Sequence, residues 1–176
     1  MAADRTITIG KSALLRFASD IFVAAGFDRA SADEWAAMLV WANLRGTDSH
    51  GVIRIPRYLD LIKQKSINAS ADVRIVKRAG AVSILEADRA PGAVAMTRAM
   101  DEAIARAREV HVGWCAARNI THSGAIGYFA LRAAEAGMAG ITMCASGPMM
   151  AYFGARVPGV STNPIGFANP AKRRQP

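Results

Sequence analysis

Residues 91–145 read PGAVAMTRAMDEAIARAREVHVGWCAARNITHSGAIGYFALRAAEAGMAGITMCA, and this stretch decides the expected fold class. Pro91 and Gly92 open a segment whose apolar side chains recur at the spacing of a helix. The pattern then predicts a strand at residues 112–116, a helix at about 126–136 and a strand at 139–145. Helices that alternate with strands favour an α/β layer architecture. The expected buried face of the first helix comprises Met96, Ala99, Met100, Ala103, Ile104 and Ala107.

The residues before this stretch are of two kinds. Two alternating runs around Ala79 and Gly80 predict a β-hairpin. The first 70 residues instead show helical spacing, and Ser31 followed by Glu34 predicts a capping box. The apolar stripes expected in the two helices are Leu14, Phe17, Ile21, Phe22 and Ala25, then Trp35, Met38, Leu39 and Ala42. We therefore expect a helical region over residues 1–70 and an α/β domain over residues 71–176.

The composition is that of a globular protein. Of 176 residues, 52% are hydrophobic and 20% are charged, which excludes a disordered chain. Residues 1–6 lack the apolar segment of a signal peptide, and no run approaches the ~20 apolar residues of a membrane helix. Cys115 and Cys144 stand singly in apolar runs, as small buried residues without the spacing of a metal site. We expect a cytoplasmic protein that uses neither a membrane nor a metal ion.

The net charge of +8 does not by itself indicate nucleic-acid binding. Proteins that bind nucleic acids gather Lys and Arg on one face, often with aromatic residues between them. Here the basic residues are dispersed, and the one dense run is at residues 172–174. An anionic substrate, an anionic cofactor or an acidic partner surface explains the excess equally well. We therefore expect no nucleic-acid partner.

A first polar cluster, TDSHGVIRIPRY, lies between two apolar runs at residues 47–58. If the segment after its glycine is helical, His50, Arg54 and Tyr58 follow at intervals of four and lie on one face. Pro56 would instead kink such a helix or begin a new one. The structural alternative is a capped turn whose histidine and arginine are only solvated.

A second polar cluster, residues 118–128, joins a predicted strand to a predicted helix, where loops of α/β proteins commonly bind ligands. It contains His122, although a lone histidine is more often a capping or core residue than a catalyst. Two further stretches, 146–154 and 161–168, are rich in glycine, proline and small polar residues. They either line a cofactor groove or are simply loops.

Taken in order, these stretches resemble the malate/L-lactate dehydrogenase-like family of NAD(P)-dependent oxidoreductases. Residues 48–51, DSHG, with Arg54 and Tyr58, look like the first active-site motif of that family. Residues 121–124, THSG, look like its second motif, and residues 161–165, STNPI, are similar to a further loop. The family includes ureidoglycolate, sulfolactate and 2,3-diketogulonate-type dehydrogenases. The resemblance covers nearly the whole chain and implies a non-Rossmann α/β fold, so the lack of a Gly-x-Gly-x-x-Gly sequence is no objection.

The resemblance implies hydride transfer between NAD or NADP and a small 2-hydroxy or 2-oxo acid, in a homodimer. Reduction of a 2-oxo acid requires a proton, which a histidine can supply near neutral pH. We favour His50, with His122 as the second candidate or as a substrate orienter. Arg54 suits a carboxylate because its guanidinium is planar and makes two parallel hydrogen bonds. The remaining expected contacts are Ser49 and Tyr58 with the substrate, and Ser146 and Asn163 with the cofactor.

Subunits of the family run to roughly twice this length, a size more usual for multi-domain enzymes. We therefore expect the α/β domain to be incomplete at its C-terminal end and the cofactor site to lack part of its wall. The alternative function is that of an inactive fragment that acts only as an association module. A basic nucleic-acid-binding module is the third possibility, but no motif supports it.

Overall fold

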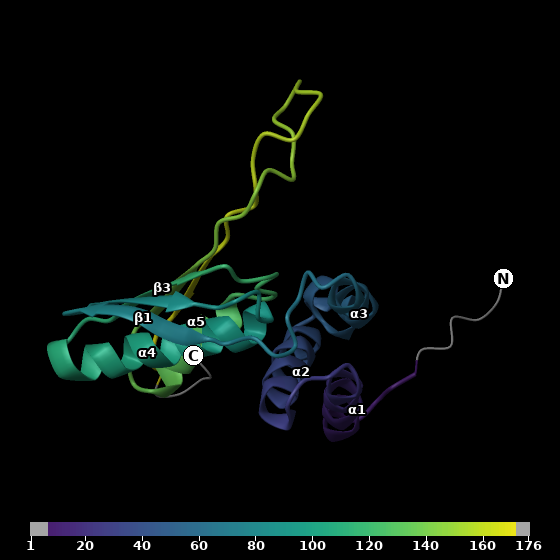
Figure 1. The fold of residues 1–176 in the computed structure, drawn as a ribbon, viewed down its shortest axis with the longest axis horizontal. Helices are drawn as coiled ribbons and strands as arrows, with labels where there is room; N and C mark the ends of the chain where they lie inside the picture. Colours follow the sequence, from purple (N-terminus) through teal and green to yellow (C-terminus); the bar gives the residue numbers. More distant parts are fainter. Residues whose placement is uncertain (1–6, 172–176) are drawn as a thin grey trace. The chain divides into compact units, whose positions relative to one another are not determined.

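The computed structural model describes residues 7–171, so the first six residues and the basic run at 172–174 lie outside the described residues. The chain divides into two compact units, Met1–Ser70 and Ala71–Pro176. The first unit is helical, and the second contains all of the described strands (Figure 1). No helix within residues 7–171 is long and apolar enough to cross a membrane.

The first unit consists of helices α1 (Lys11–Ala24), α2 (Arg29–Leu44) and α3 (Ile55–Lys63), with two short 3₁₀ turns before α3. The predicted capping box is wrong, because α2 begins upstream of Ser31. Asp28 is the N-cap, and its carboxylate accepts hydrogen bonds from the backbone N–H of Ser31 at 2.9 Å and from its hydroxyl at 2.7 Å. A carboxylate at this position also interacts favourably with the positive end of the helix dipole.

Aromatic rings form the core of the first unit. The rings of Phe22 and Trp35 stack with centroids 4.1 Å apart, and Phe27 meets Trp35 edge-on at 5.4 Å. Tyr58 packs against the other side of this group, 4.8 Å from Trp35. The stripe predicted for α2 is confirmed, since all four of its residues are buried. The apolar stripe predicted for α1 is only partly correct. Phe17 is 63% exposed, and the buried residues of α1 are Ala18, Ser19 and Phe22.

The second unit is α/β, as predicted. Strands β1 (Arg74–Ala79) and β2 (Val82–Glu86) form the expected antiparallel hairpin, with a register shift between Ile75 and Lys77. Helix α4 (Gly92–Val110) then leads to β3 (Trp114–Arg118), which pairs with β2 in parallel. Strand β3 begins two residues later than expected. The backbone at Gly113 packs directly on α4, because a Cβ at this position would lie 1.7 Å from the carbonyl oxygen of Ala103.

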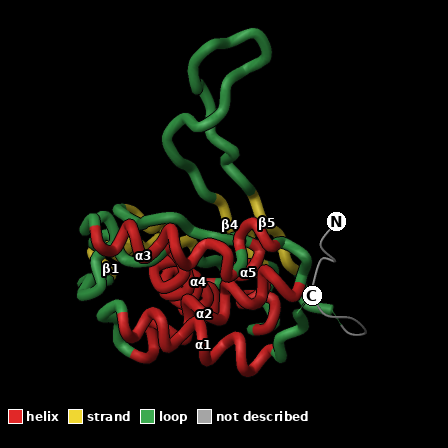
Figure 2. The backbone as a smooth tube through the Cα atoms, turned by 90° about the vertical axis from the view of Figure 1, so that its right-hand side faces the viewer, coloured by secondary structure: helices red, strands yellow, loops and turns green. Residues whose placement is uncertain are grey.

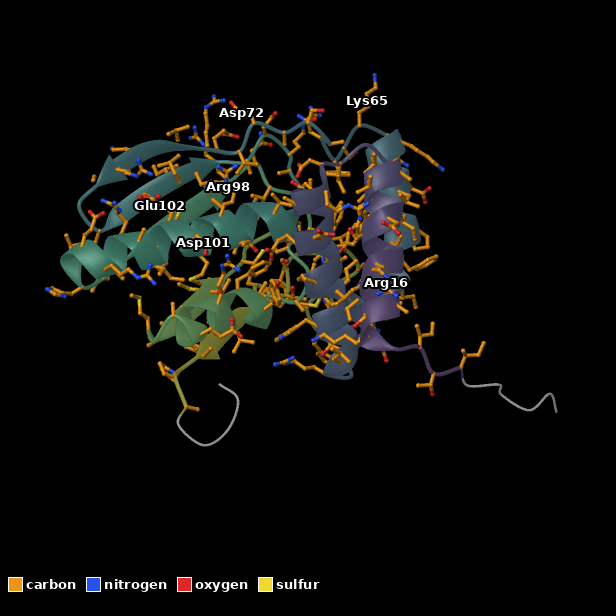
Figure 3. The ribbon with its side chains drawn as sticks, turned by 90° about the horizontal axis from the view of Figure 1, so that it is seen from below. Arg16, Lys65, Asp72, Arg98, Asp101 and Glu102 are labelled. Atoms are coloured by element: carbon orange, nitrogen blue, oxygen red, sulfur yellow. The ribbon has the colours of Figure 1, made fainter. Side chains whose placement is uncertain are left out.

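Helix α4 is tied to the hairpin by a buried carboxylate. Glu102 is 9% exposed and accepts two hydrogen bonds from Arg78, at 2.8 and 2.9 Å, and one from Ser83 at 2.7 Å. Figure 3 shows Glu102 on α4 beside Arg98 and Asp101. The predicted buried face of α4 is partly wrong: Ala99 and Ile104 are buried, but the other four residues are only half-buried. Small residues nearer the start of α4, Ala93 and Ala95, lie fully inside instead.

A second, two-stranded sheet follows. Helix α5 (Gly127–Glu135) precedes β4 (Gly140–Met143), which pairs antiparallel with β5 (Ile165–Ala168). We refer to these two strands as the β4–β5 ribbon. Helix α5 covers one of its faces closely, since a Cβ at Gly140 would lie 2.4 Å from the carbonyl oxygen of Ala130. Strand β5 was not predicted, because the pattern at residues 161–168 indicated a loop.

Residues 144–164, the arm, join the two strands of the ribbon and project from the second unit (Figure 2). The base of the arm is closed by a hydrogen bond from the Cys144 N–H to the Pro164 carbonyl, at 3.2 Å. Further out, Met150 and Val160 form an isolated antiparallel bridge. The side chains of Tyr152 and Phe153 beyond this bridge are exposed.

Candidate functional site

The first polar cluster forms two 3₁₀ turns, Asp48–His50 and Val52–Arg54, and not one helix. Gly51 separates them with an extended backbone, φ −90° and ψ −158°. Of the two alternatives that the sequence left open, one continuous helix with His50, Arg54 and Tyr58 on a single face is wrong, because the helical hydrogen-bond pattern is broken at Gly51. Pro56 lies in the first turn of α3, where its missing N–H costs no hydrogen bond, so it begins a new helix as the alternative expected.

His50 is held within this double turn. Its ring Nδ1 lies 3.0 Å from the hydroxyl oxygen of Ser49, and the ring is half-buried. Burial lowers the pKa of His50, and the positive charge of Arg54 lowers it further. Both effects disfavour the imidazolium form. The ring is therefore neutral at pH 7 and suited to accept a proton.

The guanidinium of Arg54 is held through its Nε, and its two terminal amino groups can bind a ligand. Its Nε donates a hydrogen bond of 2.5 Å to the carbonyl oxygen of Ser49, which joins the second 3₁₀ turn to the first. Within residues 7–171 no carboxylate forms an ion pair with its guanidinium. A half-buried arginine without an acidic partner is a favourable position for an anionic ligand.

Tyr58 lies in the core of the first unit. It is 1% exposed and packs against Trp35, and burial raises the pKa of its phenol to about 12. The phenol therefore stays protonated at neutral pH. Its predicted contact with substrate is untested and stays a prediction.

Asn43 is a residue of this site that sequence reasoning missed. It lies in the last turn of α2, and its side-chain Nδ2 donates to the Asp48 carboxylate at 2.5 Å. Its Oδ1 accepts a hydrogen bond from the Val52 N–H at 2.9 Å. The one signal in the sequence is an asparagine near a helix end, five residues before an aspartate, which is too common a pattern to single out.

The second polar cluster is a loop held by its neighbours in the second unit. Thr121 donates a hydrogen bond of 3.0 Å from its hydroxyl to the carbonyl oxygen of Ala90. Ser123 is buried, and its hydroxyl lies 3.0 Å from the Cys144 sulfur at the end of β4. The side chain of His122 between them is exposed. The loop thus presents His122 at the surface, while the hydroxyls on either side of it contact Ala90, just before α4, and Cys144, just after β4.

Cys144 and Cys115 are half-buried and free, so the expectation that both are buried is correct only in part. Burial raises the pKa of Cys115 to about 11, which keeps its thiol protonated. Among residues 7–171 no three potential metal ligands come together. The thiols and acids of the described residues therefore offer no metal centre.

The residues expected to contact a cofactor lie at the base of the arm. Ser146 is hydrogen-bonded through its hydroxyl to that of Ser161, on the opposite side of the arm. Asn163 is exposed and has a left-handed backbone, φ +38°, which asparagine tolerates better than most residues. Ser146 and Asn163 are both exposed, and their contact with a cofactor stays a prediction.

Comparison with known proteins places these features in a family. Residues 9–176 match the profile of the Malate/L-lactate dehydrogenase family. The malate dehydrogenase of Pyrococcus abyssi is 38% identical over 94% of this chain and 46% of its own length. The ureidoglycolate dehydrogenase (NAD(+)) of Escherichia coli K12 is 38% identical over 84% of this chain and 42% of its own length. The chain thus spans about half the length of these relatives.

Solved structures give the same result. The malate dehydrogenase from Pyrococcus horikoshii OT3 matches with a TM-score of 0.93 and 35% identity, over 99% of this chain and 50% of that chain. The sulfolactate dehydrogenase from Methanocaldococcus jannaschii matches with a TM-score of 0.88 and 34% identity, over 93% and 47%. From the extent of these matches we conclude that the chain belongs to the malate/L-lactate dehydrogenase family.

Proposed function

We propose that this chain carries the substrate- and proton-handling part of an oxidoreductase that transfers a hydride between NAD or NADP and a small 2-hydroxy or 2-oxo acid. The relatives that support the proposal are named for hydroxy acid substrates: malate, sulfolactate and ureidoglycolate. The observation that carries it is the double turn, in which a neutral histidine and an unpaired arginine are fixed through Ser49. We further propose that the enzyme is cytoplasmic and a homodimer.

In this proposal the two groups of the turn act on one substrate. Arg54 binds the carboxylate of the acid through its terminal amino groups, while its Nε remains on the Ser49 carbonyl. When the hydroxy acid is oxidised, a hydride leaves the carbinol carbon and the hydroxyl proton passes to the His50 imidazole as the carbonyl forms. In the reverse direction the imidazolium returns that proton to the new alkoxide. The lowered pKa of His50 favours the base role at neutral pH.

The nicotinamide cofactor supplies the hydride acceptor or donor when it is bound. Ser146 and Asn163, at the base of the arm, are the proposed hydrogen-bond partners of the dinucleotide, and the ureidoglycolate dehydrogenase (NAD(+)) of Escherichia coli supports a nicotinamide cofactor. His122 is the second candidate for proton transfer, or it orients the substrate. Ser49 and Tyr58 are retained as proposed substrate contacts.

The test is an NMR titration of the chain with malate, sulfolactate and ureidoglycolate. We expect at least one acid to shift the imidazole signals of His50, and Arg54→Lys to weaken that binding by roughly ten-fold or more, because an ammonium cannot make the two-pronged contact. Arg57→Lys is the matched control, since Arg57 is exposed on the first turn of α3. If none of the three acids moves His50 in the folded protein, the proposed role of the turn is wrong.

An inactive association module is the second candidate function, and the open face of the β4–β5 ribbon favours it. Ile141 opposes Phe167 and Met143 opposes Ile165 on the face away from α5, and these four side chains are between 47% and 68% exposed. An apolar cross-strand patch of this kind is typical of a surface that another polypeptide covers. Acid binding at His50 distinguishes the two functions. The oxidoreductase requires such binding, whereas a module that acts only by association does not.

A further inference from the structure

The amide of Asn43 spans the whole double turn. Its Nδ2 reaches Asp48, the first residue of the first 3₁₀ turn, and its Oδ1 reaches the N–H of Val52, the first residue of the second. One planar side chain therefore ties both turns to the end of α2. The bond to Val52, at 2.9 Å, has an ordinary length, and the bond to Asp48, at 2.5 Å, is shorter than an ordinary N–H···O bond.

Gly51 shows how closely this amide approaches the backbone. A Cβ at position 51 would lie 2.3 Å from Oδ1, 2.4 Å from Cγ and 2.5 Å from Nδ2 of Asn43. The φ of Gly51 is −90°, which any residue adopts, so backbone conformation does not require a glycine here. A Cβ at this position would instead push the Asn43 amide away from its two hydrogen bonds, so glycine is the residue that is compatible with them. The glycine of the DSHG sequence is thus explained by a residue that lies eight positions before it.

His50 immediately precedes this contact, and Arg54 closes the second turn. Their backbone N–H groups donate to the carbonyls of Thr47 and Gly51, at 3.0 Å in each case. Removal of the Asn43 amide would break both of its hydrogen bonds, while the extended Gly51 and the bond from Arg54 to Ser49 would remain. We expect the orientation of the imidazole relative to the guanidinium to be less constrained without these two hydrogen bonds.

We propose that Asn43 is the positioning residue of the turn, which holds His50 and Arg54 in register through its two hydrogen bonds and its contact with Gly51. The importance of this register rests on the proposed function, but the clamp itself is a geometric feature of the unliganded chain. A positioned catalytic pair needs such support from neighbouring groups that are themselves fixed.

The test is a reciprocal exchange of the two side chains. Asn43→Asp keeps an acceptor for Val52 but sets two carboxylates side by side, and Asp48→Asn alone leaves two amides. The double variant N43D/D48N restores one donor and one acceptor with the direction reversed, and Asn43→Ala removes both hydrogen bonds. Asn68→Ala is the structural control, because it removes a side-chain bond to the Ser70 N–H elsewhere in the same unit.

The readouts are hydrogen exchange of the Val52 amide and the pH titration of the His50 ring by NMR. In Asn43→Ala we expect Val52 to exchange roughly ten-fold faster, since an amide hydrogen bond of ordinary strength is lost. We also expect the pKa of His50 to rise toward its usual value as the turn loosens and the ring becomes hydrated. In the double variant the exchange rate of the Val52 amide should return to within about three-fold of the wild-type rate. The pKa of His50 should return to within about a few tenths of a pH unit of the wild-type value.

The clamp is refuted if Val52 and His50 behave as in wild type when Asn43→Ala is folded, or if N43D/D48N is no better than Asn43→Asp alone. If Asn43→Ala does not fold, the comparison of Asn43→Asp with the double variant still decides the matter. None of these measurements involves substrate or turnover. A failure of the acid titration would therefore leave this result intact, and a failure here would not affect the acid titration.

Discussion

Gly92→Ala is expected to destabilise the second unit and to displace the His122 loop. A Cβ at Gly92 would lie 2.4 Å from the carbonyl oxygen of His122 and 2.5 Å from the Cα of Ser123. Both neighbours are backbone atoms, so no side chain can turn away to make room. The loop cannot retreat easily either, because Thr121 is bonded to Ala90 and Ser123 contacts Cys144.

The size of the effect follows from two opposing contributions. Inserting a methyl group into a packed site typically costs about 1–3 kcal/mol. Replacing glycine by alanine also restricts the unfolded chain, which stabilises the fold by about 0.4–1 kcal/mol. The expected net loss is about 1–2 kcal/mol. With a urea m-value of about 1–3 kcal/mol/M, the unfolding midpoint should fall by roughly 0.3–2 M.

The assay is urea unfolding followed through the amide NMR signals of β2 and β3, which report on the second unit alone. Gly147→Ala is the matched control, since a Cβ there would meet nothing within 4 Å. We expect the control to be neutral or slightly stabilised, and the amide signals of residues 121–124 to shift only in Gly92→Ala. Equal midpoints for the two variants would refute the argument that this loop is packed directly on the start of α4.

Three further predictions follow from charges and exposed surface. Arg54→Gln should raise the pKa of His50, measured by NMR titration, because a positive charge is removed; burial should still keep it below the usual value. Glu102 has a pKa of about 2 against an ordinary 4.5, chiefly through its hydrogen bonds with Arg78, so its contribution to stability is complete above about pH 4.5 and is lost as the pH falls toward 2. Urea midpoints measured between pH 2 and 5 should show this dependence, and Glu102→Gln should flatten it. Finally, we expect the chain by itself to self-associate and to show no dehydrogenase turnover; light scattering should decrease in Phe167→Thr, and a monodisperse chain that reduces a 2-oxo acid would contradict this expectation.

The parts of the fold that the sequence predicts well are those with a strong local pattern. The β1–β2 hairpin, α4 and α5 follow from alternation, helical spacing and Gly or Pro punctuation, all of which act within a few residues. Strand β5 does not follow, because its four residues come directly after Asn163 and Pro164 and pair with a strand more than twenty positions earlier. The exposure of Phe17 was missed for a related reason: helical spacing gives a stripe, but the neighbouring helix decides how much of it is covered.

Some residues of the candidate site could likewise be predicted from the sequence, and others could not. Ser49, His50 and Arg54 could be selected from the sequence because reactive side chains are concentrated in a short segment. Of the two arrangements left open, the continuous helix was wrong and the new helix at Pro56 was correct, whereas spacing alone did not show that Gly51 would be extended. Asn43 could not be found, because its importance lies in two hydrogen bonds across a turn and in a contact with a residue that has no side chain. The residue types thus indicate which side chains can react, whereas the residues that position those side chains are found only from the packing.

The exposed apolar face of the β4–β5 ribbon affects which of the proposed activities the chain can show by itself. Parallel pairing of β2 with β3 is a form of sheet that is normally covered on both faces, and helices α4 and α5 here cover one face of the two sheets. On the other face of the ribbon, Ile141, Met143, Ile165 and Phe167 remain exposed. Matched structures such as the Pyrococcus horikoshii enzyme contain about as much chain again as the part that matches. The hydrogen bonds described above for the double turn all lie within the first unit. The proposed cofactor contacts lie at the base of the arm, which continues from a ribbon with one exposed apolar face. Acid binding at His50 is therefore expected to survive in the chain alone, while hydride transfer is expected to require a covered ribbon.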